Sequence, residues 1–99
     1  MKEEFCIMND HPPYWRNFRF TGSERHEVFE GRTGNRNKSI EDGLVIFLTP
    51  EQHRTGKHSI HKDRQFSLYA KEMAEQKWID YYGKSKDDFR KRYGRNYLD

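Results

Sequence analysis

The run Leu44-Val45-Ile46-Phe47-Leu48 constrains the fold most, because the rest of the chain offers little apolar material for a core. Only 32% of the 99 residues are hydrophobic, whereas 35% are charged. Five apolar residues in a row are typical of a buried β-strand. Upstream, residues 25–29 end in two residues that favour strands, and they predict a second short strand. Between the two, Gly31 to Asn37 hold two glycines and two asparagines and predict an irregular loop, and Ser39 to Asp42 predict one helical turn.

An aromatic-rich segment, residues 1–24, precedes this core. Phe5 to Met8 is a short apolar run that can begin a strand, and Pro12 and Pro13 end it because proline has no backbone donor. Tyr14 to Phe20 partly alternates aromatic and polar residues, which is compatible with another strand. We expect this segment to supply aromatic side chains to a thin aliphatic core.

Helices are predicted to follow the apolar run. Pro50 stands at a first helical position with Thr49 as its N-cap, which predicts a short helix over Glu51 to Arg54 that ends at Gly56. From about Ser59 to Tyr82, apolar residues recur at three- and four-residue steps, which is typical of a long helix with one aromatic face in the core.

A second, short helix is predicted near the C-terminus. Ser85 to Asp88 has the pattern of a capping box. Phe89 and Tyr93 lie four residues apart and are expected to face the core. The chain is therefore predicted to form one α+β domain over residues 1–99, whose part from 63 to 99 is helical.

Charge and cysteine content bear on the expected partners and cellular compartment of the chain. The net charge of +3 is only mildly basic and says little by itself about nucleic acid. Cys6 is the only cysteine, which excludes an intramolecular disulfide and fits a reducing cytoplasm. No apolar stretch approaches the ~18–20 residues that span a bilayer, so no membrane is expected. A chain this short and polar often depends on a metal, a partner or a homodimer.

Four of the five histidines lie between Arg25 and His61. Histidine is the commonest metal ligand among side chains. His26 is on the predicted first strand, His53 is in the short helix after the second, and His58 precedes the last of the four by three residues. Because the turn brings strand and helix into contact, these imidazoles can converge on one ion; the alternative is surface histidines that never meet. Two or three imidazoles with open positions suit a catalytic divalent ion.

The motifs around these histidines occur in a definite order. His-Glu-Val-Phe-x-Gly is followed by Asn-Arg-x-Lys-Ser, by Gly-Leu-Val-x-x-Leu-x-Pro-Glu-x-His-Arg, and by Ile-His. In this order they resemble small phage-associated proteins of the HNH endonuclease superfamily. The closing Tyr-Gly-Arg-Asn-Tyr-Leu also resembles the C-terminal signature of such phage proteins. The resemblance covers Arg25 to Leu98, and its specificity lies in the order of the motifs rather than in any one of them.

The resemblance implies a ββα-metal core over residues 25–62, in which two strands, a long loop and a helix surround one divalent ion (Mg, Mn, Ni or Zn). It implies an endonuclease of phage or prophage origin that hydrolyses phosphodiester bonds in nucleic acid, DNA rather than RNA, in the cytoplasm of a bacterial host. In that family a His or Asp at the end of the first strand ligates the metal. The His directly after it activates a water, an Asn orients that His or joins the site, and a His from the helix completes the metal shell.

Carried onto this chain, the pattern assigns three groups of residues. The catalytic candidates are His26, Glu27, Asn35 and Asn37. The metal-ligand candidates are His26, His53, His61 and His58. The candidates for phosphate contacts are the basic residues of the loop and around the histidines, Arg32, Arg36, Lys38, Arg54, Lys57, Lys62 and Arg64.

The chain also departs from the family pattern. If His26 is the ligand, Glu27 stands where the family has its water-activating His. A carboxylate can accept a proton, but its pKa falls beside a cation. In the other register His26 is the base, and Arg25, which cannot bind a cation, holds the ligand position. Gly43 stands where the family has an Asn, for which the two loop asparagines are the available substitutes.

Two alternatives to a nuclease follow from these departures. One is a catalytically degenerate HNH-fold module that binds nucleic acid or protein. The other is a small metal-stabilised or dimeric interaction protein with no role in nucleic-acid chemistry. Whether the chain is an enzyme depends mainly on Glu27. The cysteines that hold a structural zinc in many relatives are also missing, because Cys6 is alone.

Overall fold

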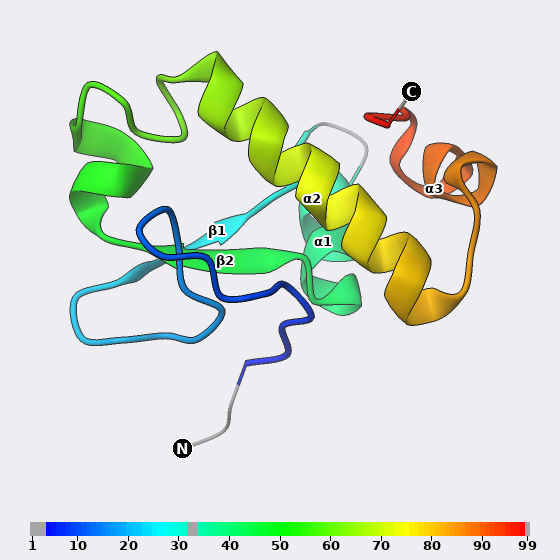
Figure 1. Ribbon diagram of the computed structural model, residues 1–99, viewed down its shortest axis with the longest axis horizontal. Coiled ribbons are helices and arrows are strands. Elements are labelled where there is room, and N and C mark those ends of the chain that lie inside the picture. Colours follow the sequence, from blue (N-terminus) through cyan, green and yellow to red (C-terminus); the bar gives the residue numbers. More distant parts are fainter. Residues whose placement is uncertain (1–3, 32–33, 99) are drawn as a thin grey trace.

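The computed structural model describes residues 4–31 and 34–98. Its elements are, in chain order, β1 (Glu24–Glu27), α1 (Asn35–Asp42), β2 (Val45–Leu48), η1 (Glu51–Thr55), α2 (Arg64–Tyr82) and α3 (Lys86–Tyr93). In Figure 1 the long helix α2 crosses the pair of strands. The helix α3 lies near the C-terminal end of α2, and η1 lies on the other side of the molecule, after the end of β2. The predicted α+β class is confirmed at the level of a two-stranded antiparallel sheet packed with helices.

The apolar run forms the centre of the sheet. Every residue of β2 is buried, and β2 pairs with β1 in an antiparallel register that places His26 opposite Ile46. The predicted buried strand is confirmed, although it begins one residue later than the run. Leu44 instead accepts two hydrogen bonds through its carbonyl, from Val28 N at 3.1 Å and from Ser39 Oγ at 2.7 Å.

The first strand is shorter than predicted at its C-terminal end. It ends at Glu27, and after one further backbone hydrogen bond, from Val28 N to Leu44 O, the chain bends and buries Val28 and Phe29 in the core. Phe29 packs against Phe89 and Tyr93 with ring centroids 5.2 and 4.8 Å apart. Aromatic burial at this point outweighs the strand preference of the two residues.

The strands predicted for the N-terminal segment are wrong. Among residues 4–23, backbone pairing with β2 is limited to a bridge between Arg16 and Phe47. Ile7 N adds a single hydrogen bond to Gly43 O, at 2.8 Å. The alternating aromatics do not follow a sheet, because Trp15 turns into the core and stacks on Phe66 of α2.

The loop predicted over residues 31–37 is wrong in its last part, where α1 already begins at Asn35. Asparagine is a weak helix former, so this start needs support from outside the helix. Asn35 Nδ2 donates to Tyr93 O at 3.0 Å, and Lys38 Nζ donates to Arg92 O at 2.8 Å. These bonds tie α1 to the end of α3, which local sequence does not reveal.

The short helix after β2 is present as one turn of π-helix, η1, and ends before Gly56 as predicted. Thr49 and Gln52 exchange hydrogen bonds at its start. Gln52 N donates to Thr49 Oγ1 at 3.1 Å, and Thr49 N donates to Gln52 Oε1 at 3.0 Å. The predicted capping role of Thr49 is therefore confirmed.

The predicted start of the long helix at Ser59 is wrong. The helix α2 begins at Arg64, and Asp63 caps it by accepting hydrogen bonds from Gln65 N and Phe66 N. The preceding residues form a turn in which Ser59 O accepts from Asp63 N at 2.7 Å. His61 therefore lies in a turn before α2 and not at the entry of the helix.

The terminal helix α3 agrees with its prediction. Ser85 and Asp88 form the capping box, and Phe89 and Tyr93 are both buried. The residues that follow return to α2, where Glu75 Oε1 accepts a hydrogen bond from Tyr97 N at 2.6 Å.

Glu75 is an unusual core residue, because its carboxyl group is fully buried and its Oε2 has no hydrogen-bond partner within the described part of the chain. Burial raises its pKa above the ordinary 4.5, although the backbone N–H groups of Tyr97 and Leu98 oppose this. A carboxyl group with a raised folded-state pKa contributes stability below its unfolded pKa, and that stability is lost as the pH rises through the folded value.

We therefore expect the free energy of unfolding of the wild type to fall, relative to Glu75→Gln, as the pH rises above about 4.5. Urea denaturation of both proteins at intervals from pH 4 to 7 measures this difference. A difference that stays constant over this range would show that the carboxyl group titrates alike in the folded and unfolded states.

Candidate metal centre

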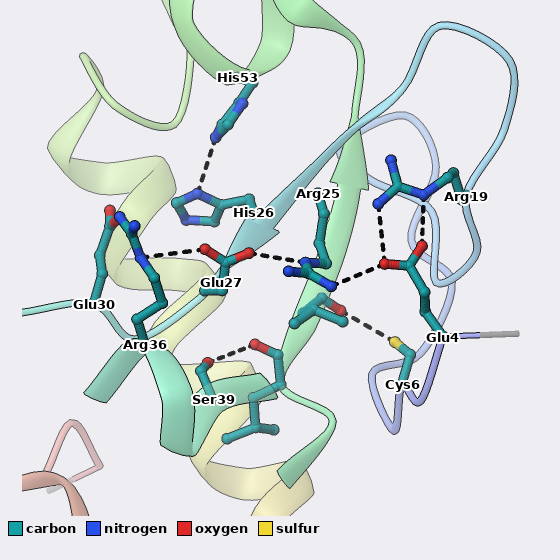
Figure 2. A network of polar contacts seen from close by, with 12 residues as sticks. Glu4, Cys6, Arg19, Arg25, His26, Glu27, Glu30, Arg36, Ser39 and His53 are labelled. Atoms are coloured by element: carbon teal, nitrogen blue, oxygen red, sulfur yellow. Dashed lines mark hydrogen bonds and ion pairs between the residues drawn. The ribbon is translucent and has the colours of Figure 1, made fainter. Parts of the chain in front are cut away.

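Three of the four predicted ligand histidines come together. Ring nitrogens of His26, His53 and His61 all lie within 4.8 Å of one another. They are supplied by the middle of β1, by η1, and by the turn before α2. Pairing of β1 with β2 brings the first two together, and the hydrogen bond from Ile60 N to Gln52 O, at 2.8 Å, returns the turn to η1. Figure 2 shows the ring of His26 directed toward His53.

The two short distances of this cluster meet at one atom. His53 Nε2 lies 3.2 Å from His26 Nδ1 and 2.9 Å from His61 Nε2. The other nitrogen of the same ring, His53 Nδ1, lies 2.8 Å from Glu24 Oε1. A carboxylate only accepts hydrogen bonds, so His53 Nδ1 carries the ring proton and donates a hydrogen bond to Glu24. In the neutral ring, Nε2 is then left with a lone pair that points at the other two histidines.

A cation between the rings suits this donor set better than hydrogen bonds alone. One lone pair on His53 Nε2 cannot serve two N–H donors well, whereas three lone pairs can share one metal ion. Two nitrogens bound to one zinc ion at about 2.0–2.1 Å in a tetrahedral shell lie roughly 3.3 Å apart. The observed separations of 3.2 and 2.9 Å are close to this value. The three imidazoles thus fit a divalent transition-metal ion.

Electrostatics keep two of the three ligands, His26 and His61, unprotonated. Burial lowers the pKa of His26 to about 3, with further contributions from the neighbouring His53 and His61 and from nearby basic side chains. Burial also lowers the pKa of His61, against the opposing effect of Glu30. Both rings are therefore neutral at pH 7 and offer lone pairs for which no proton competes.

The remaining catalytic and ligand candidates lie elsewhere. The side chain of His58 is 81% exposed and pairs with Asp63, at 3.5 Å, outside the cluster. Asn35 donates to α3, and Asn37 is exposed on α1. Glu27 lies between Arg25 and Arg36.

The basic candidates differ in their partners and in their exposure. Lys38 is engaged with the end of α3, at Arg92 O, whereas Arg36 pairs with two carboxylates near the cluster. Four more are exposed along η1 and the turn after it or at the start of α2, namely Arg54, Lys57, Lys62 and Arg64. Arg32 lies outside the described residues.

Sequence reasoning missed the two carboxylates that support the cluster, Glu24 and Glu30. Glu30 Oε1 lies 3.8 Å from His61 Nδ1. A signal for Glu24 was present, because residues i and i+2 of a strand share a face and Glu24 precedes His26 by two. No comparable pattern points to Glu30.

Removing the Glu24 carboxylate should weaken metal binding. A carboxylate that accepts a hydrogen bond from a ligating histidine fixes the tautomer of that ring and raises the basicity of its metal-binding nitrogen. We expect Glu24→Ala to reduce the affinity for Zn²⁺ by about 10–100-fold. Glu24→Gln, whose amide oxygen can still accept from His53 Nδ1, should lose less. Competition with a chromophoric chelator measures both, with Glu51→Gln in the exposed part of η1 as the control. An affinity of Glu24→Ala equal to that of the control would show that Glu24 does not support the ligand.

Among the described residues, no helix is both long and apolar enough to span a membrane. Comparison with protein-family models, with curated proteins and with solved structures found no match.

Proposed function

We propose that the protein is a metal-dependent endonuclease of the HNH type that hydrolyses phosphodiester bonds in DNA. The observation that carries the proposal is the convergence of three imidazoles from β1, η1 and the turn before α2. In this proposal His26, His53 and His61 hold one divalent ion, and the two strands with the segment after them form the ββα-metal core.

The origin of the ligands supports this assignment. His26 comes from the first strand and His53 from the first turn after the second strand, which is the order that the sequence motifs assign to the HNH pattern. His61 supplies the third nitrogen in place of His58. Three imidazoles suit Zn²⁺, Ni²⁺ and similar ions better than Mg²⁺, which prefers oxygen ligands. When bound, such an ion would stabilise charge on the scissile phosphate and the leaving oxygen.

The charge around the cluster suits an anionic polymer. Arg54 and Lys71 lie near enough to His26 to contribute to the lowering of its pKa. Lys62 and Arg64, which follow His61 closely in the sequence, are exposed. Cations placed in this way contact phosphates and position a backbone without reading bases.

One observation favours a second candidate, a module with the same fold that binds DNA without cutting it. Glu27 stands at the position of the water-activating His, but its carboxylate is paired with Arg25 at 2.9 Å and with Arg36 at 3.4 Å. Each of its two oxygens thus faces a guanidinium group and is not free to take a proton from a water molecule. The two candidates share the metal site and differ only in turnover.

Nicking of a supercoiled plasmid in the presence of Zn²⁺, Ni²⁺, Mn²⁺ or Mg²⁺ tests the proposal. We expect the wild type to nick with at least one transition metal and to stop when EDTA is added. His26→Ala and His53→Ala should reduce the rate by at least about 100-fold, since ligand loss removes the ion that stabilises the transition state. His58→Ala is the matched control and should retain the wild-type rate, because its side chain is 81% exposed and outside the cluster.

The outcomes separate the candidates. DNA binding without nicking under every metal supports the binding module. Nicking that persists in both His26→Ala and His53→Ala contradicts the assignment of the site. If the protein binds a metal but neither binds nor nicks DNA, only the third alternative remains, a small metal-stabilised interaction protein.

A further inference from the structure

A chain of alternating charges begins at Arg25 on β1 and passes through Glu27 to Arg36 and Glu30 (Figure 2). Arg25 pairs with Glu27 at 2.9 Å, and Arg36 lies between Glu27 and Glu30 at 3.4 Å from each. Glu30 in turn lies 3.8 Å from Nδ1 of His61. The chain thus ends with Glu30 next to the candidate metal centre and with Arg36 one ion pair away from it.

The guanidinium of Arg36 is held but not saturated. Its Nε faces Glu27 and its Nη2 faces Glu30. Both contacts are 3.4 Å long, and the side chain is 62% exposed. A guanidinium has five N–H donors in a planar fork, so donors remain available on its open side.

The carboxylate that holds it is itself fixed. The side chain of Glu27 is only 14% exposed, and Arg25 engages its second oxygen at 2.9 Å. A long arginine side chain on the first turn of α1 would otherwise sample many rotamers in water. Holding it in place before the ligand arrives reduces the entropy lost on binding.

We propose that Arg36 binds a DNA phosphate beside the metal centre and that Glu27, at the position of the expected base, is the positioning residue that holds Arg36 there. This inference rests on the proposed function, because it takes the bound anion to be a phosphodiester of the substrate. Arginine suits this task because its planar fork can donate two parallel hydrogen bonds to phosphate oxygens.

The alternative is an ion-pair network that only stabilises the fold, and the two differ in the expected effect of Glu27→Gln. Removing a negative charge near a DNA-binding surface should tighten DNA binding if Glu27 acts only through its charge. If Glu27 positions Arg36, the same substitution should weaken binding.

Fluorescence anisotropy with a labelled 16-base-pair duplex in EDTA tests this without cleavage or metal. We expect Arg36→Gln to raise the Kd by about 5–10-fold at 0.1 M salt and to reduce the salt slope by about 1. Glu27→Gln should raise the Kd by roughly threefold, and the double variant should bind like Arg36→Gln, because both act through one contact. Arg90→Gln, an exposed arginine paired with Asp87 on α3, is the matched control and should stay within about twofold of the wild type.

Tighter binding by Glu27→Gln, additive effects in the double variant, or an Arg36→Gln Kd equal to that of the control would overturn the inference. So would a wild type that does not bind the duplex. Arg36→Lys keeps the charge without the fork and should fall between wild type and Arg36→Gln, which guards against a folding defect in the glutamine variant. Loss of DNA binding in these variants of a protein that never nicks DNA would retain the inference and reject the nuclease.

Discussion

Replacing His53 with alanine should reduce the affinity for Zn²⁺ by more than about 100-fold, the upper end of the loss caused by removing a supporting partner. His53 is the central ligand, because its Nε2 makes both short contacts of the cluster and its Nδ1 binds Glu24. Its removal also leaves the buried His26 without the imidazole nitrogen that its Nδ1 contacts. Competition with a chromophoric chelator measures the affinity.

His58→Ala is the control for this variant. Like His53→Ala, it removes one imidazole, but this imidazole belongs to a side chain that lies outside the cluster. We expect its affinity for Zn²⁺ to equal that of the wild type. If His53→Ala and His58→Ala lose affinity to the same degree, the ion is bound by scattered surface histidines and not by the cluster.

Replacing Asp42 with alanine should lower the free energy of unfolding by about 3–5 kcal/mol, which is the usual cost of removing one partner of a buried ion pair. The Asp42 carboxylate connects three helices. It accepts hydrogen bonds from Trp78 Nε1 at 2.9 Å, from Tyr93 Oη at 2.7 Å, and from Arg92 Nε at 2.6 Å. Without it, an indole N–H, a phenol and a guanidinium lose their common acceptor.

Glu41→Ala is the matched control for Asp42→Ala. Glu41 is the neighbouring acid on α1 and also pairs with Arg92, at 3.2 Å, but its side chain is 68% exposed. An exposed pair of this kind contributes at most about 1 kcal/mol. Urea denaturation of both variants, monitored by tryptophan fluorescence and by circular dichroism, measures the difference. Equal losses in the two variants would show that the three helices are held by apolar packing alone.

The parts of the fold that were predictable are those in which local pattern and tertiary packing agree. The apolar run became β2, and the Ser85 capping box became the start of α3, because burial and capping act within a few residues. Only the second half of α1 was predicted, as a turn over Ser39 to Asp42. Its first half was missed, because side-chain bonds from Asn35 and Lys38 to the end of α3 support it across more than fifty residues. The N-terminal strands were predicted wrongly, because alternation of aromatics does not show whether they follow a sheet or pack on a helix.

The candidate site shows the same division. The histidines could be picked out because few residue types bind metal ions, and three of the four meet. Which three meet depends on where α2 begins, since a helix that started at Ser59 would turn His61 differently. The supporting Glu24 was detectable from strand alternation with His26. The partners of Glu27 were not, because Arg36 reaches it from a helix that the sequence pattern did not predict.

The central claim is that His26, His53 and His61 bind a single divalent ion. Crystals grown with Zn²⁺ and measured on both sides of the zinc absorption edge test it most directly. The claim predicts one anomalous peak within about 2.0–2.3 Å of His26 Nδ1, His53 Nε2 and His61 Nε2. A cluster without a peak, in which the three rings contact one another directly, would contradict it, as would a peak only at exposed residues such as His58 and Asp63.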